Sequence, residues 1–322
     1  MKQAFENREL ITLECQGLPI CGTVHHARTS TVDGDKGKRL GIVFLNSLTL
    51  PRAATGDSAV YWSDALAASG YPVFRVDLPG LGDSDGNLPA EILDYINSGG
   101  FASAAAALTA EIVRRFELSG VILAGHCAGS VSALFAVPQC SECRGVILLD
   151  PYFHLPRAIR PKVRQWLSEW VLRSATGRIV SNIYDQLRKI RLSLGGERLP
   201  ENANSALIRI WSRIAPTGLP ILFLKAPSRK AVGTKPRQGE FDYFRYVLKA
   251  AGRKHRVTVE VVEGTDHSFA NRHGRDVVRQ HMEMWLNKHF PTGQQVSRGD
   301  DKETRQSGAY AAEVGVGVGS SA

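Results

Sequence analysis

Six short runs of apolar residues recur along the chain, separated by stretches with helical periodicity or by loops. A continuous apolar run, without polar alternation, is typical of a strand that is buried on both faces. Strands that alternate with helices form a parallel sheet with helices on both sides. The pattern therefore predicts an α/β fold with a mostly parallel central sheet, whose strands span residues 40–45, 71–77, 120–125, 145–149, 221–224 and 257–262.

An N-terminal hairpin precedes this pattern, because β-prone runs at 10–15 and 20–26 flank the turn-forming segment Gly17-Leu18-Pro19. The alternation stops at Asp150 and resumes at residue 221, and the intervening sequence is helical and amphipathic from 160 to 214. We therefore expect a core of residues 1–150 and 218–290, with a helical cap of 151–217 inserted after the sixth strand. The Gly- and Ser-rich tail, 291–322, is expected to be disordered.

The predicted cap carries much of the net charge of +9, because it holds twelve Lys and Arg residues against four acidic ones. A solvated helical surface explains this excess, and so does a positive rim that attracts an anionic substrate. No nucleic-acid-binding motif accompanies the charge, so nucleic acid is not an expected partner.

Composition indicates a cytoplasmic protein. No apolar run approaches the roughly 18 residues of a membrane span, and the charged N-terminus lacks the apolar segment of a secretory signal. Five scattered cysteines do not form a disulfide framework. Cys140 and Cys143 form a single CxxC without a second pair, so neither a metal nor a cofactor is predicted.

The strongest chemical signal is the segment Gly125-His126-Cys127-Ala128-Gly129, which follows a buried strand and precedes a helix. Flanking glycines allow the sharp strained turn that lifts a nucleophile above the edge of a sheet. The helix N-terminus favours the thiolate of Cys127. His126 is expected to pack or to line the pocket. The alternative interpretation is a small cysteine buried on a turn.

This segment resembles the G-x-S-x-G elbow of the α/β-hydrolase superfamily, with cysteine in place of serine. Asp77-Leu78-Pro79-Gly80-Leu81-Gly82-Asp83-Ser84 resembles the superfamily's D-x-x-G-x-G-x-S loop, and Gly264-Thr265-Asp266-His267-Ser268-Phe269 resembles its G-x-x-H-x-F loop. The three motifs occur in the superfamily's order and span nearly all of residues 40–290. They are specific for the fold and weak for the substrate.

The resemblance implies that His267 is the general base and that an acid supports it. The usual Gly-x-x-Asp loop after the strand at 221–224 is replaced by a segment without a carboxylate. Asp150, at the end of the strand 145–149, and the later Asp242 with its neighbour Glu240 are the candidates. We prefer Asp150 because strand ends position groups more rigidly than loops do, and because Leu148-Leu149-Asp150-Pro151-Tyr152 resembles polyketide-type thioesterases that place the acid there.

The resemblance also implies an oxyanion hole formed by the backbone N–H of Ala128 and one N–H from the loop after residues 40–45, by position that of Leu48, with Ser47 as the alternative. The loop that carries Leu48 departs from the superfamily pattern, because Asn46-Ser47 replaces the usual His-Gly.

Together these features predict an acyl hydrolase or acyltransferase that forms an acyl-thioester on Cys127, most suitably from an acyl thioester. The acyl substrate would be a small molecule or a carrier-bound group, anionic if the basic cap binds it, and no stable membrane insertion is expected. Two alternatives stay open: a carboxylesterase or lysophospholipase-like hydrolase, and a ligand-binding member of the fold that has lost catalysis.

Overall fold

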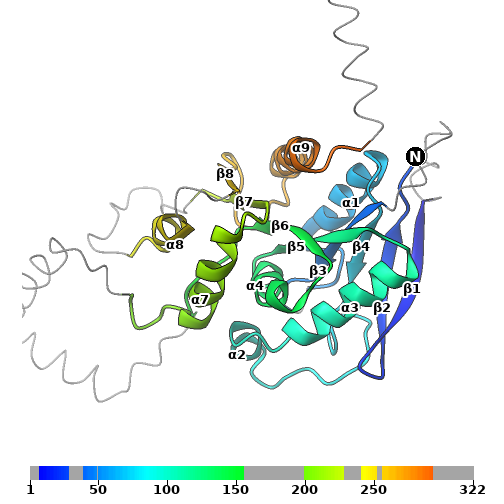
Figure 1. Ribbon diagram of the computed structural model, residues 1–322, viewed down its shortest axis with the longest axis horizontal. Helices are drawn as coiled ribbons and strands as arrows, with labels where there is room; N and C mark the ends of the chain where they lie inside the picture. Colours follow the sequence, from blue (N-terminus) through cyan, green and yellow to red (C-terminus); the bar gives the residue numbers. More distant parts are fainter. Residues whose placement is uncertain are drawn as a thin grey trace, which may run out of the picture.

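The computed structural model describes residues 7–28, 39–48, 50–155, 199–227, 241–251 and 256–292. Within these residues, eight strands form one sheet in the order β1-β2-β4-β3-β5-β6-β7-β8 (Figure 1). The strands are β1 (Arg8–Cys15), β2 (Leu18–His25), β3 (Leu40–Leu45), β4 (Val73–Val76), β5 (Gly120–His126), β6 (Cys143–Leu149), β7 (Ile221–Lys225) and β8 (Val257–Val261).

The sheet is mostly parallel, as the sequence predicts. All pairings from β4 to β8 are parallel, whereas β1 pairs antiparallel with β2, and β2 pairs antiparallel with β4. The predicted hairpin is confirmed, and its two-residue turn is formed by Gln16 and Gly17 with φ values of 54° and 80°. Two positive φ angles are those of a type I′ turn, whose twist matches that of the strands.

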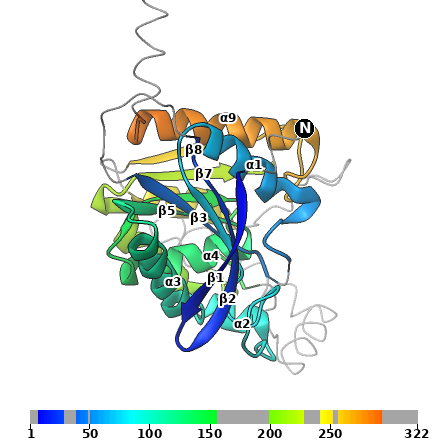
Figure 2. The same cartoon turned by 90° about the vertical axis from the view of Figure 1, so that its right-hand side faces the viewer.

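Helices cover both faces of the sheet. One face carries α1 (Ser58–Ala68) and α9 (Arg272–His289), and Figure 2 shows these two helices together along one side of the sheet. The other face carries the remaining helices, which pack into the second core: α2 (Ile92–Asn97), α3 (Ala102–Arg115), α4 (Ala128–Ala136), α7 (Ser205–Ile214) and α8 (Tyr243–Ala251). The carboxyl ends of the parallel strands, where the sequence motifs lie, meet at one edge between these layers.

Two details differ from the sequence prediction. The last strand, β8, lies at the edge of the sheet, and Val261 is 45% exposed, so the prediction of a strand buried on both faces is wrong there. Helix α2 was not predicted because it is a short helix, followed closely by a pair of glycines, Gly99 and Gly100. Tertiary packing of its buried Ile96 stabilises it.

Helix α7 lies within the sequence range of the predicted cap and packs into the helical layer of the core. Its Trp211 is fully buried, contacts Phe223 of β7, and donates a hydrogen bond from Nε1 to the Val247 carbonyl at 2.6 Å. Residues 156–198 of the cap and residues 293–322 of the tail lie outside the described residues, so the basic cap and the disordered tail stay predictions. None of the described helices is long and apolar enough to cross a membrane.

Candidate active site

Cys127 occupies the sharp turn between β5 and α4, with φ 52° and ψ −113°. Both flanking glycines are required there. A Cβ on Gly125 would lie 2.3 Å from the carbonyl carbon of Gly129, and one on Gly129 would lie 2.5 Å from the Leu45 carbonyl oxygen. The Cys127 thiol is partly exposed, at the start of a buried helix. The geometry is that of a nucleophile elbow.

His267 lies in the loop between β8 and α9 and pairs with Asp150, which directly follows β6. The distance from His267 Nδ1 to Asp150 Oδ2 is 2.5 Å. The end of β7 fixes Asp150, because the Asp150 N–H donates to the Leu224 carbonyl at 2.7 Å and Oδ1 accepts from the Ala226 N–H at 3.3 Å. Asp150 is therefore held by backbone on two sides while its second oxygen holds the imidazole.

The environment of His267 favours the protonated ring. The hydrogen bond to Asp150, and after it the interaction with the Cys127 side chain, raise the pKa of His267 to about 10. The His267 side chain is 49% exposed, so a substrate has access to it. Since Nδ1 faces Asp150, the other ring nitrogen, Nε2, is the one available to the thiol and to a leaving group.

The second acid candidate has a different structural role. Asp242 is exposed and accepts a hydrogen bond from the Arg245 N–H at 3.0 Å, which caps the start of α8. Glu240 lies outside the described residues. Among the predicted site residues, the structure thus brings Cys127, His267 and Asp150 together at the edge of the sheet.

His126, at the end of β5, supports the loop that carries His267. Its Nε2 donates to the His267 carbonyl oxygen at 2.6 Å, and its ring centroid lies 4.9 Å from that of His267. Burial lowers the pKa of His126 to about 4, so the ring is neutral at physiological pH and carries its proton on the donating nitrogen. The sequence predicts packing for His126; its role in holding the loop depends on a contact between positions 141 residues apart.

The two predicted oxyanion donors lie on neighbouring elements. Ala128 is the first residue of α4, where a backbone N–H has no partner within the helix. Leu48 follows β3 with φ 49°, in a turn closed by a hydrogen bond from the Leu50 N–H to the Ser47 carbonyl at 2.9 Å. Gly129 leaves room for the backbone after β3 to approach the start of α4. The two predicted donors therefore lie on adjoining segments of the backbone, and their role as an oxyanion hole stays a prediction.

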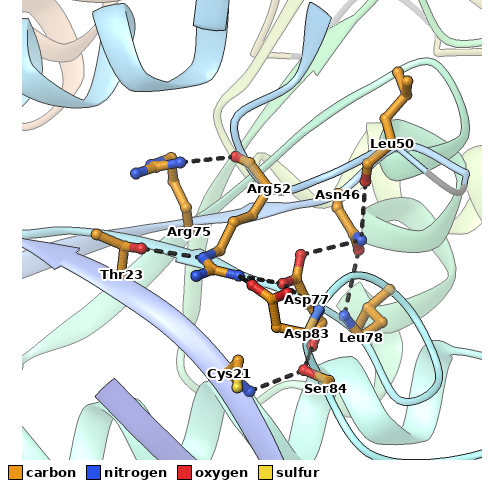
Figure 3. A network of polar contacts seen from close by, with 10 residues as sticks. All are labelled: Cys21, Thr23, Asn46, Leu50, Arg52, Arg75, Asp77, Leu78, Asp83 and Ser84. Carbon is orange, nitrogen blue, oxygen red and sulfur yellow. Dashed lines mark hydrogen bonds and ion pairs between the residues drawn. The ribbon is translucent and has the colours of Figure 1, made fainter. Parts of the chain in front are cut away.

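A buried network anchors this loop to the sheet (Figure 3). The Asp77 carboxylate is fully buried at the end of β4 and accepts from Arg52 Nη1 at 2.5 Å and from Asn46 Nδ2 at 3.4 Å. Asn46 Oδ1 in turn accepts from the Leu78 N–H at 3.3 Å. Asn46, which departs from the superfamily pattern, therefore supplies an amide that fastens the loop after β3 to Asp77.

The D-x-x-G-x-G-x-S segment completes the same network. Gly82 has φ 55°, and a Cβ there would lie 2.4 Å from the Asp77 carboxylate. Arg52 Nη1 also donates to Asp83 Oδ2 at 2.7 Å, and Ser84 Oγ donates to the Asp77 carbonyl at 2.9 Å. This motif therefore has a structural role, since it closes the loop that surrounds the buried carboxylate.

Backbone strain concentrates at the site. Eight non-glycine residues with positive φ occur in the described part of the chain, and four of them are site residues or lie beside one: Leu48, Cys127, Asp150 and Phe269. Such conformations cost of order 1–3 kcal/mol each and persist where the surrounding structure enforces them. The concentration at one edge of the sheet indicates a functional site.

The fold and the site together define the class of protein. A sharp strand-to-helix turn at the edge of the sheet, beside a histidine–aspartate pair, is the arrangement of an α/β hydrolase. The sequence profile of the alpha/beta hydrolase family matches residues 42–280. The chain belongs to this family, and it is a hydrolase in that general sense. No curated protein matches it by sequence.

Solved structures agree on the fold. An esterase from Pyrococcus furiosus, PF2001, superposes with a TM-score of 0.56 and 13% identity, covering 89% of this chain and 93% of the esterase. DcsB, solved in complex with its substrate analogue, superposes with a TM-score of 0.55 and 15% identity, covering 88% of this chain and 100% of DcsB. Est1E from Butyrivibrio proteoclasticus, solved with bound ferulic acid, superposes with a TM-score of 0.53 and 14% identity, covering 88% of this chain and 100% of Est1E.

Proposed function

We propose that the protein transfers or hydrolyses acyl groups through an acyl-thioester on Cys127, with His267 as acid and base and Asp150 as its orienting partner. The observation that carries the proposal is the position of His267 between the Asp150 carboxylate and the Cys127 side chain, with its pKa raised to about 10 by both. A protonated imidazole at neutral pH makes the thiolate the nucleophile and the imidazolium its partner.

In the first half-reaction, Cys127 Sγ bonds to the acyl carbonyl carbon, and the oxyanion accepts hydrogen bonds from the Ala128 and Leu48 N–H groups. The tetrahedral intermediate collapses by breaking the bond to the leaving group, which takes the proton from His267 Nε2. In the second half-reaction, neutral His267 accepts a proton from water or another acceptor as it attacks the acyl carbon. Cys127 then leaves as a thiolate, and the imidazolium is restored.

Acyl thioesters are the preferred substrates because of the leaving group. A thiolate attacks a thioester readily, since the leaving thiolate has a pKa similar to that of the attacking one. An oxoester expels a much more basic alkoxide, which a cysteine displaces poorly. The predicted basic cap would suit an anionic carrier portion of the substrate.

The test compares matched thioester and oxoester series and records the intact mass of the protein after each incubation. We expect thioesters to be turned over at least about tenfold faster, with an acyl adduct that the Cys127→Ala variant does not form. An enzyme that hydrolyses simple oxoesters rapidly and is indifferent to thioesters would be the carboxylesterase alternative. Absence of both turnover and adduct would favour a ligand-binding protein.

Alkylation by iodoacetamide at neutral pH supplies an internal control. Burial raises the pKa of the Cys140 thiol to about 11 and that of the Cys143 thiol to about 12, so both should react slowly. We expect Cys127 to be alkylated first. Equal labelling of the three cysteines in the native protein would argue against an activated thiol.

A further inference from the structure

Two buried polar atoms near Cys127 have no role in the chemistry described above. Within the described residues, Tyr152 Oη and Asn97 Nδ2 are both inaccessible to solvent and neither completes a hydrogen bond. Buried polar groups in proteins form hydrogen bonds with few exceptions, so two neighbouring buried groups that complete none need an explanation. A substrate atom that binds between them would supply one.

Tyr152 lies beside the reacting groups. It follows Asp150 by two residues, and after burial the charge of Cys127 is the next cause that raises the Tyr152 pKa to about 12. The segment around it is fixed by backbone hydrogen bonds, because the Phe153 carbonyl accepts from the Asn204 N–H at 2.9 Å and the Leu155 N–H donates to the Asn202 carbonyl at 2.7 Å. The backbone on the C-terminal side of Tyr152 is therefore held in place.

Asn97 faces the same hydroxyl from α2, which packs against α4, and its side-chain amide lowers the Tyr152 pKa without reaching the geometry of a hydrogen bond. Its oxygens are already occupied, since Asn204 Nδ2 donates to the Asn97 backbone carbonyl at 2.9 Å and lies 3.4 Å from Oδ1. Asn204 is fixed in turn, because its Oδ1 caps α7 by accepting from the Leu207 N–H at 3.0 Å. This orientation leaves the Nδ2 donor of Asn97 turned away from Asn204 and beside the Tyr152 hydroxyl, with which it does not complete a hydrogen bond.

We propose that Tyr152 and Asn97 form a polar subsite that binds an oxygen acceptor of the substrate, a keto or hydroxyl oxygen close to the reacting carbonyl. The inference rests on the proposed acyl transfer at Cys127 and names the class of acyl group that it takes. The Tyr152 hydroxyl and the Asn97 amide donate to one oxygen, which a plain hydrocarbon chain cannot offer. The subsite therefore selects oxygenated acyl groups over their deoxy counterparts, because the latter leave both donors buried and unpaired.

The test measures kcat/KM for a 3-hydroxyacyl or 3-ketoacyl thioester and for the deoxy acyl thioester of the same length. We expect the wild-type protein to prefer the oxygenated substrate, and Tyr152→Phe to lower that preference at least about tenfold. Asn97→Asp, which keeps an oxygen toward Asn204 and loses the donor, should lower it in the same direction. Tyr243→Phe is the matched control, because the Tyr243 hydroxyl already donates to Asn202 Oδ1 at 2.7 Å.

Thermal unfolding of the substrate-free protein separates this role from a structural one. Removal of an unpaired buried hydroxyl should leave the melting temperature of Tyr152→Phe unchanged or raise it, whereas loss of a structural hydrogen bond would lower it. A wild-type protein without preference, or a preference that survives in Tyr152→Phe, would overturn the subsite and leave the acyl-transfer proposal standing. If neither series is turned over and no adduct forms on Cys127, the proposed function fails, and the subsite fails with it.

Discussion

The described residues include two histidine–aspartate pairs with opposite electrostatics. In the candidate active site, His267 Nδ1 lies 2.5 Å from Asp150 Oδ2, and the pKa of His267 is raised to about 10. At the end of hairpin strand β2, His25 Nδ1 lies 2.8 Å from Asp64 Oδ1 of α1, and the pKa of His25 is lowered to about 4. A carboxylate at Nδ1 therefore does not by itself decide the charge of a histidine.

The difference lies in burial and in what faces the second ring nitrogen. His25 has a side-chain exposure of 1%, and its Nε2 accepts from Arg75 Nε at 2.9 Å, so burial first and the guanidinium second disfavour the cation. His267 has a side-chain exposure of 49%, and Cys127 adds to the effect of Asp150. The first pair is a neutral structural link, whereas the second is arranged to hold and release a proton.

Removal of the thiol should have the largest effect on activity. Cys127→Ala should lower kcat/KM for an acyl thioester by at least about a thousandfold, because the acyl-enzyme cannot form. It should also lower the His267 pKa, by removing the second of the two groups that raise it. NMR titration of the histidine ring protons gives the pKa. A His267 pKa that stays near 10 in this variant would show that Asp150 alone accounts for it.

Asp150→Asn should have the next largest effect, a loss of about a hundredfold or more in kcat/KM, because the hydrogen bond that orients and charges His267 is weakened. The pKa of His267 should fall toward its ordinary value of about 6.5. The stabilisation that Asp150 provides is full below pH 6.5, declines as the pH rises, and is lost above about pH 10, so the variant should be most destabilised at low pH.

Asp242→Asn is the matched control for this variant, since Asp242 is an exposed cap of α8. Its activity and its pH profile should match those of the wild type. If Asp242→Asn reduced activity as much as Asp150→Asn does, the assignment of the orienting acid would have to be revised.

The His25–Asp64 pair should affect the stability of the protein at acid pH and leave its turnover unchanged. Because unfolded His25 binds a proton near pH 6.5 and folded His25 only near pH 4, the free energy of unfolding should fall as the pH drops through this window. A shift of this size corresponds to about 3 kcal/mol. Chemical denaturation from pH 7.5 to 4 should show a shallower dependence in His25→Gln. The dependence should persist in part, since the pKa of buried His126 is lowered in the same direction. Identical pH dependences in the two proteins would contradict the contrast between the pairs.

Local sequence was sufficient for the parts of the protein that depend on neighbours in the chain. Five of the six apolar runs correspond to strands that are mostly buried, because a continuous run of apolar residues reports burial on both faces of a strand. The two strands of the hairpin were predicted from their β-prone residues and the turn between them. Gly125 and Gly129 predict the turn at Cys127, since only glycine avoids the backbone contacts that a Cβ would make there. His267 was identified by its motif, and Asp150 by its place at a strand end.

Tertiary structure decided what depends on contacts between distant segments. The sequence could only prefer Asp150 over Asp242. The 2.5 Å distance from His267 Nδ1 to Asp150 Oδ2 depends on the fold, which brings the end of β6 and the loop after β8 to the same edge of the sheet. Three features have no local signature: the anchoring of the loop after β3 by Asn46 and Asp77, the support of His267 by His126, and the donors of Tyr152 and Asn97 that complete no hydrogen bond. Sequence thus determined the fold class and the residues capable of chemistry, because propensity and periodicity act over a few residues. The protonation state and the partner of each titratable group were decided by the fold, because charge and burial depend on distance in space.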